Sequence, residues 1–188
     1  MRRLAFALAA LISITALGQA QPYRAVDVEA DIQTAESVIG KRIAAERAEF
    51  APHAAILAPD PVLTAIARER SEAMAHGAPF AHEDEKGQFA AGSMVQRRLS
   101  RFGAVGENIM MEHDPSRSFD AAAFARRAVA GWMSSEGHRG NILSPVFARS
   151  GIGVAVNGSY AYATQVFWGP PPKAPGQGLA AIPRHRGK

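Results

Sequence analysis

The chain of 188 residues contains no cysteine. Disulfide bonds, a thiol nucleophile and attachment as a lipoprotein through a lipid-modified cysteine are therefore all excluded. Small secreted domains often rely on disulfides because their cores are small. This chain must instead rely on buried apolar surface, and a domain of roughly 150 residues is large enough to bury most of it.

No apolar run at the N-terminus is long enough to span a membrane. The stretch from Leu4 to Leu17 falls short of the roughly 20 residues that such a helix needs. It follows Met1-Arg2-Arg3 and precedes Gly18-Gln19-Ala20, which is the three-part pattern of a secretory signal. We expect a signal peptide over residues 1–20, cleaved after Ala20, and no transmembrane segment after cleavage. The protein is then exported, to a periplasm or to the exterior, and an uncleaved anchor is the alternative.

A strong charge of one sign is also missing from the domain, although the whole chain has a pI of about 9.8. The signal holds two of the 21 basic residues and the tail after Trp168 holds four, which leaves 15 basic against 17 acidic residues in between. No basic stripe is interleaved with aromatic residues, so nothing supports nucleic-acid binding. The basic, Pro- and Gly-rich residues 169–188 are expected to be a disordered tail. Residues 21–168 are expected to form one domain.

Hydrophobic periodicity predicts four helices in this domain. Asp60 followed by Pro61 is a typical helix start, and Gly77 is a typical helix stop. Two alternating runs around Asn157-Gly158 predict a β-hairpin with a type I′ turn at these two residues. A loop is expected at Gly106-Glu107-Asn108-Ile109. The helices are expected at residues 27–49, 60–76, 93–102 and 118–134, and the strands at 151–156 and 159–167.

The sequence contains neither an HExxH helix nor a GxSxG elbow, so it has no recognisable protease or esterase motif. Two histidines, His82 and His138, each have an acidic residue within two positions, and Glu107 is flanked by glycine. Two imidazoles and a carboxylate that converge would suit Zn²⁺. From spacing alone, solvated loop histidines and a glutamate that caps a helix or bonds backbone amides are the favoured explanation of these residues.

Five motifs in order carry a resemblance to a known family. The chain resembles the bacterial, cysteine-free branch of the CAP superfamily, whose module is also called the SCP domain and which includes cysteine-rich secretory proteins, antigen 5 and plant pathogenesis-related proteins. The similarity runs from about Ile32 to Trp168. The motifs are Phe80-Ala81-His82, Gly106-Glu107-Asn108-Ile109, the run from Trp132 to Leu143, Gly151-Ile152-Gly153-Val154 and the run from Tyr162 to Phe167.

The resemblance implies an α+β fold, a three-layer α-β-α sandwich with a central, mainly antiparallel sheet. It also implies a cleft lined by two histidines and two glutamates. His82, Glu107 and His138 match three of these positions. The fourth position falls at Ser135 or Glu136.

Three hypotheses follow for this cleft. The first is a non-catalytic extracytoplasmic binding module that holds a divalent metal, Zn²⁺, and an unidentified lipid or protein ligand. The second is a zinc-dependent, peptidase-like hydrolase in which Glu107 acts as the general base. The third is a lipid- or sterol-binding envelope protein whose site is formed by apolar helix faces. Because no nucleophile motif is present, a binding role is favoured over an enzymatic one.

Overall fold

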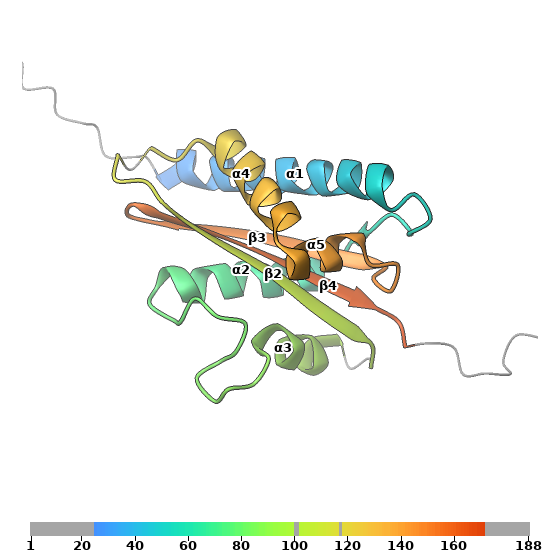
Figure 1. The fold of residues 1–188 in the computed structure, drawn as a ribbon. Coiled ribbons are helices and arrows are strands. Elements are labelled where there is room, and N and C mark those ends of the chain that lie inside the picture. Colours follow the sequence, from blue (N-terminus) through green and yellow to red (C-terminus); the bar gives the residue numbers. More distant parts are fainter. Residues whose placement is uncertain (1–24, 100–101, 117, 172–188) are drawn as a thin grey trace, which may run out of the picture.

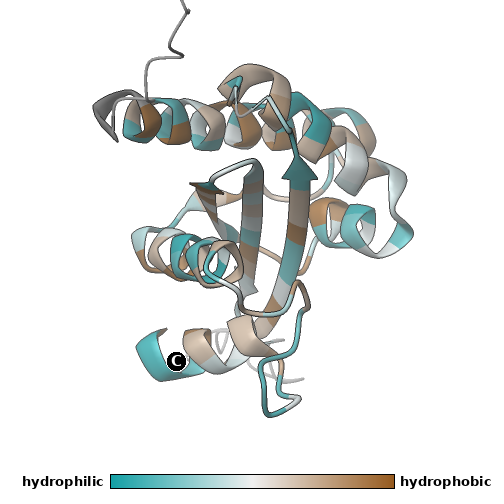
Figure 2. Ribbon diagram, turned by 90° about the vertical axis from the view of Figure 1, so that its left-hand side faces the viewer, coloured by the Kyte–Doolittle hydropathy of each residue, from teal (hydrophilic) through white to brown (hydrophobic). Residues whose placement is uncertain are grey.

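A four-stranded sheet lies between two layers of helices (Figures 1 and 2). The computed structural model describes residues 25–99, 102–116 and 118–171. The predicted signal peptide and nearly all of the predicted tail lie outside these residues. The strands are β1 (Ala58–Pro59), β2 (Ala104–His113), β3 (Arg149–Asn157) and β4 (Tyr160–Gly169), in the order β1-β3-β4-β2. The short β1 is parallel to β3 and the other two pairings are antiparallel, so the predicted fold class is confirmed.

The helices form two layers, one on each face of the sheet. On one face lie α1 (Ala25–Phe50), α4 (Ala121–Ser134) and α5 (Glu136–Leu143), and on the other lie α2 (Pro61–Ala75) and α3 (Ala90–Leu99) (Figure 1). The hydrophobic core on the first face includes Phe124, Trp132 and Phe167. The core on the second face includes Leu63, Ile66 and Val166. In the described part of the chain, no helix has the length and apolar character needed to cross a bilayer.

Helix α2 lies directly on β3 because two glycines leave room for it. A Cβ atom at Gly151 would stand 2.0 Å from the backbone nitrogen of Thr64, and one at Gly153 would stand 2.1 Å from that of Arg68. The start of α2 is as predicted, since the Asp60 carboxylate accepts hydrogen bonds from two amides of its first turn. The Gly-x-Gly spacing of β3 thus fixes the position of the helix that carries one side of the functional site.

Several predicted elements need correction. Gly106-Glu107-Asn108-Ile109 lies in the middle of β2 and not in a loop. All four residues are buried, and the buried polar pair Glu107 and Asn108 hides the apolar alternation by which a strand is recognised. Helix α3 begins at Ala90, three residues before its predicted start, and Phe102, its predicted last residue, is not helical. The helix predicted over 118–134 starts at Ala121, where Asp120 caps it.

The hairpin is confirmed, but its turn is shifted by one residue. Asn157 pairs with Tyr160, which leaves Gly158 and Ser159 as the two loop residues, and Gly158 has a φ of 62°. Helix α5 was not predicted. It is short, its glycines lower its helix propensity, and Ile142 is its single buried residue among those described. This helix matters because it carries His138.

Candidate functional site

The candidate site is a cluster of polar side chains at the β2 edge of the sheet, where the resemblance implies a cleft, and Glu107 is its centre. The Glu107 side chain is fully buried, and both its carboxylate oxygens are engaged. Oε1 accepts a hydrogen bond from Arg70 Nε at 2.9 Å, and Oε2 accepts one from His82 Nδ1 at 2.8 Å. Because a carboxylate only accepts hydrogen bonds, this contact fixes the proton of His82 on Nδ1 and leaves Nε2 facing outward.

Arg70 was missed by the sequence reasoning. It lies on α2 and is only 6% exposed, and a second hydrogen bond runs from its Nη2 to the backbone oxygen of Ala81 at 2.6 Å. It therefore holds both Glu107 and the loop that presents His82. A signal for it was present, since Ile66, Arg70 and Met74 follow one another at intervals of four on a helix. An arginine on such an apolar stripe indicates a buried acidic partner.

His82 lies in the loop between α2 and α3, and its side chain is 40% exposed. The loop is fixed at a second point by a hydrogen bond from the Ala90 amide to the His82 carbonyl at 3.0 Å. The hydrogen bond with Glu107 raises the pKa of His82, and Glu83 acts in the same direction, whereas burial and the charge of Arg70 act against it. The imidazole is therefore protonated more readily than a free histidine.

His138 faces His82 from α5. The two ring centroids are 5.8 Å apart and the ring planes meet at 63°. Burial lowers the pKa of His138, and so does the charge of His82. The pKa values of the two histidines are thus shifted in opposite directions, upward for His82 and downward for His138.

Two asparagines attach α5 to β2. Asn108 Nδ2 donates to the His138 carbonyl at 3.1 Å, and Asn141 Nδ2 reaches both the Glu107 carbonyl at 3.1 Å and Asn108 Oδ1 at 2.9 Å. These bonds cross directly from one element to the other. The asparagines of the second and third motifs therefore hold the backbone of the helix that carries His138.

The predicted fourth position does not join the cleft. Glu136 is exposed at the first turn of α5, and Ser135 is the residue that precedes this helix. Within the described residues, no hydrogen bond or ion pair connects either of them with His82, Glu107 or His138. The structure brings together three of the four predicted residues, with Arg70 as an unpredicted fourth.

The metal-binding prediction concerns the same side chains. Within residues 25–99, 102–116 and 118–171, no group of three or more His, Asp or Glu side chains is arranged to hold an ion. Both oxygens of Glu107 are hydrogen-bonded to Arg70 and His82. The ring centroids of His82 and His138 are 5.8 Å apart, and an ion bound to both imidazoles at about 2.1 Å would hold them roughly 5 Å apart. Glu107 then stands behind His82, as carboxylates commonly do behind metal-bound histidines.

Fold and cleft together define an α-β-α sandwich domain with two facing histidines backed by a buried glutamate. The sequence model described as "CAP: Cysteine-rich secretory protein family" matches residues 51–168, and the chain belongs to this family. A search of curated proteins gave no match.

Solved structures share the fold. An extracellular protein containing an SCP domain from Bacillus anthracis is similar with a TM-score of 0.60 and 26% identity over 78% of this chain. This chain covers 44% of that protein, so it spans less than half of its length. An outer surface protein from Borrelia burgdorferi has a TM-score of 0.61 and 14% identity, over 77% of this chain and 96% of the other. At that identity the second likeness concerns the fold alone.

Proposed function

We propose that this protein is a non-catalytic binding module that works outside the cytoplasm and binds a divalent metal, Zn²⁺, between His82 and His138. Export is supported by the signal-like residues 1–20 and by the extracellular location named for the similar Bacillus anthracis protein. The observation that carries the proposal is the environment of Glu107, which is fully buried and bonded on both oxygens.

Glu107 is the positioning residue of this proposal. By accepting the Nδ1 proton of His82 it fixes the tautomer whose Nε2 is free to bind a metal. His138 contributes the second imidazole, and its lowered pKa keeps it in the neutral form that a metal requires. A divalent ion held by two imidazoles would offer open coordination positions to an anionic group of a ligand.

The hydrolase alternative requires Glu107 to be a general base. A general base must reach the water from which it takes a proton. The Glu107 side chain is 0% exposed, and Arg70 neutralises its charge at 2.9 Å. Neither condition suits a base that must approach a water in the cleft, so the arrangement favours binding over hydrolysis.

The test is a calorimetric titration of Zn²⁺ into the metal-stripped chain that begins at Gln21. His82→Ala and His138→Ala should each abolish measurable binding, and Glu107→Gln should weaken it about 10- to 100-fold. His76→Ala is the matched control, because His76 is exposed and bonds only within its own helix. It should leave the affinity unchanged.

Two results would overturn the proposal. Equal zinc affinity in the parent and in His82→Ala or His138→Ala would remove the cleft as the metal site. Turnover of a peptide or ester substrate that disappears in His138→Ala would show that the cleft is catalytic.

A further inference from the structure

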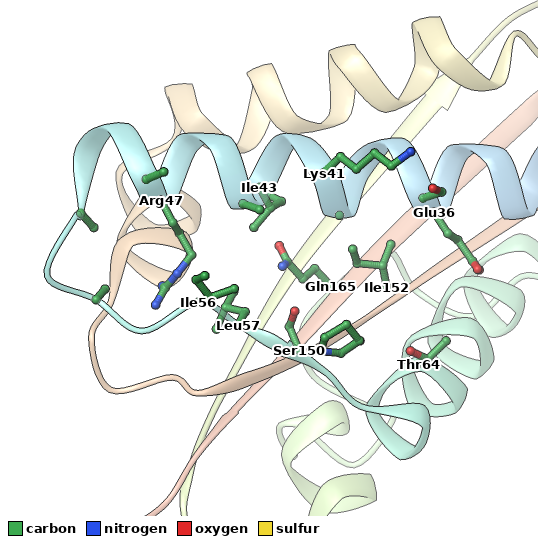
Figure 3. Close-up of a pocket in the computed structure, with 18 of the residues that line it drawn as sticks. Glu36, Lys41, Ile43, Arg47, Ile56, Leu57, Thr64, Ser150, Ile152 and Gln165 are labelled. Carbon is green, nitrogen blue, oxygen red and sulfur yellow. The ribbon is translucent and has the colours of Figure 1, made fainter.

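A second, apolar pocket lies beneath α1, between this helix, the segment that leads to β1, and the β3 edge of the sheet (Figure 3). Its volume is about 730 Å³, within the range of roughly 300–1,000 Å³ typical of binding pockets. Its lining does not include His82, Glu107 or His138, so it is separate from the polar cluster described above. Most of its wall is apolar or small, and includes Ile43, Ala44, Ala48, Ile56, Leu57 and Ile152.

One polar side chain on the floor of this pocket has an unused donor and an unused acceptor. Gln165 on β4 is 0% exposed, and among the described residues neither its amide nitrogen nor its amide oxygen has a hydrogen-bond partner. Figure 3 shows its amide pointing up from the sheet between Ile43 and Ile152. A buried amide without partners destabilises a fold, and native proteins rarely keep one without a reason.

The neighbouring polar residue cannot satisfy Gln165. Asn108 is its cross-strand partner on β2 and lies on the same face of the sheet. Both amide atoms of Asn108 are already used, because Nδ2 donates to the His138 carbonyl and Oδ1 accepts from Asn141. The donor and the acceptor of Gln165 therefore both remain available to a group in the pocket.

These unused atoms indicate the chemistry of the missing partner. A primary amide is satisfied by a group that offers one acceptor and one donor side by side, as a peptide group does. An ionised carboxylate offers acceptors only and would leave Gln165 Oε1 unpaired. Arg47 in the pocket wall is 3% exposed, and its Nε is a further donor without a partner among the described residues. The polar groups therefore suit a peptide backbone, and the apolar wall suits apolar side chains.

The chain leaves the sheet close to this pocket. Ser150 lines the pocket and pairs with Phe167, near the end of β4. From Gln165 to the end of β4 is four residues, or about 13 Å along a strand. The structure describes the chain as far as Pro171, and Leu179 lies eight residues further on. Eight extended residues span up to about 26–29 Å, so the chain beyond Pro171 is long enough to return to the pocket.

Residues 179–182 have the composition that the pocket requires. They are Leu, Ala, Ala and Ile, the one apolar run of four in residues 172–188. The run carries no charge, which matters because Lys41 and Arg47 line the pocket and disfavour a basic segment. Glu36 also lines it, but its carboxylate is bonded to Arg68 at 2.8 and 2.6 Å and is not free to attract one.

We propose that residues 179–182 of the same chain occupy this pocket as an extended peptide. A peptide group of the run bonds with both amide atoms of Gln165, and the leucine and isoleucine side chains lie against the apolar wall of α1 and β3. Ile56, which is 84% exposed, stands at the pocket and would be covered by the segment. Composition alone favours disorder for residues 169–188, but a segment that joins a preformed core needs only a short apolar run. The proposal does not depend on metal binding at His82 and His138.

Amide hydrogen exchange measured by NMR in the chain from Gln21 to Lys188 tests the proposal directly. At least one amide of residues 179–182 should exchange at least tenfold more slowly than in a free peptide of residues 172–188, because its N–H is bonded to Gln165 Oε1. Gln165→Met keeps the length of the side chain but removes the amide. It should reduce this protection about tenfold.

Two substitutions on adjacent residues of α1 locate the site. Ala44 lines the pocket and Ala45 does not, although both are exposed on the same helix. Ala44→Phe should fill the pocket and abolish the slow exchange, while Ala45→Phe should leave the exchange rate within about twofold. Circular dichroism of each variant establishes that it is folded.

A peptide added in trans separates the pocket from the rest of the chain. A chain ending at Pro171 keeps every helix and strand of the structure, and its pocket is then without a ligand. A peptide of residues 172–188 should bind this chain at a ratio of one to one by calorimetry. It should bind the full chain at least tenfold more weakly, because the tethered segment competes at an effective concentration near millimolar. In the peptide, Leu179→Asp should weaken binding at least tenfold, and the matched control Gln177→Asp should leave it within about twofold.

The proposal fails if residues 179–182 exchange as fast as in the free peptide, if both phenylalanine variants behave alike, or if the peptide binds the full and the shortened chain equally well. It also fails if native mass spectrometry of the full chain shows a bound small molecule that is lost in Ala44→Phe, or if sedimentation shows a dimer that Ala44→Phe dissociates. That molecule or a second copy would then be the occupant. If Ala44→Phe does not fold, the two peptide variants still decide the question, because they leave the domain unchanged.

Discussion

Replacing Arg70 with leucine should destabilise the domain more than replacing any exposed arginine. The substitution leaves the Glu107 carboxylate buried with one of its two partners removed, and it also frees the loop that Arg70 holds through the Ala81 carbonyl. Both side chains of the pair are nearly inaccessible, at 7% and 0% exposure, so solvent does not screen their interaction. Breaking a buried pair of this kind costs about 3–5 kcal/mol.

This magnitude can be converted into a thermal shift. For a domain of this size, 1 kcal/mol corresponds to roughly 2–4 °C, so Arg70→Leu should lower the Tm by roughly 6–20 °C. Urea unfolding followed by the fluorescence of the buried Trp132 and Trp168 measures the free energy of unfolding directly. The matched control is Arg98→Leu. Arg98 pairs with Glu69 at the surface, where both partners are well exposed, and its loss should cost at most about 1 kcal/mol.

A double variant separates the pair from the loop contact. Arg70→Leu combined with Glu107→Leu removes both charges, and it should recover part of the loss because no charge remains buried without a partner. The reasoning is refuted if Arg70→Leu costs no more than Arg98→Leu. It is also refuted if the double variant is as unstable as the sum of the two single variants, since the two residues would then act independently.

Three further predictions concern the same fold. Gly153→Ala should lower the free energy of unfolding in urea by about 1–3 kcal/mol or more, because the added Cβ would meet the α2 backbone. Gly137→Ala, on the open face of α5, should raise it by about 0.5–1 kcal/mol. A similar effect of both substitutions would contradict the packing of α2 on β3. In metal-free protein, the raised pKa of His82 means that its pairing with Glu107 stabilises the fold fully below pH about 6.5, and that this contribution is lost as the pH rises through the raised value. His82→Asn should therefore cost more stability at pH 5.5 than at pH 9. An equal cost at both pH values would refute this prediction. Gln165→Met should raise the stability of the ligand-free protein by about 1–3 kcal/mol by differential scanning calorimetry, and a fall would mean that the amide has a partner such as a buried water.

The elements that are specified by contacts within a few residues of the chain were predictable from the sequence. Asp60-Pro61 at the start of α2 and the alternating runs of the hairpin were identified because capping and period-two alternation act within a few residues. Strand β2 was not identified. Its centre is polar, so the apolar alternation that marks a strand is absent there, and α3, α4 and α5 pack against it.

The site was predictable to the same extent. The family resemblance located His82, Glu107 and His138, and the structure brings these three side chains together. The resemblance did not point to Arg70. The apolar stripe of α2 indicates that Arg70 has a buried acidic partner, but it does not identify Glu107, which lies 37 positions away. This one contact changes the interpretation of Glu107 from a metal ligand or base to the residue that orients His82.

Helix α5 contacts both the cleft and an apolar pocket beneath α1, which is lined by Arg47 and Gln165 among others. The two sites lie at different edges of the sheet. Its first half carries His138, whose carbonyl is held by Asn108, and its final carbonyls accept hydrogen bonds from Arg47 in the wall of the pocket. Asn108 and Gln165 are cross-strand partners, so the support of α5 and the floor of the pocket are neighbours on one face of the sheet. A short helix with one buried residue has little packing of its own to resist displacement. Its position therefore depends on these polar contacts.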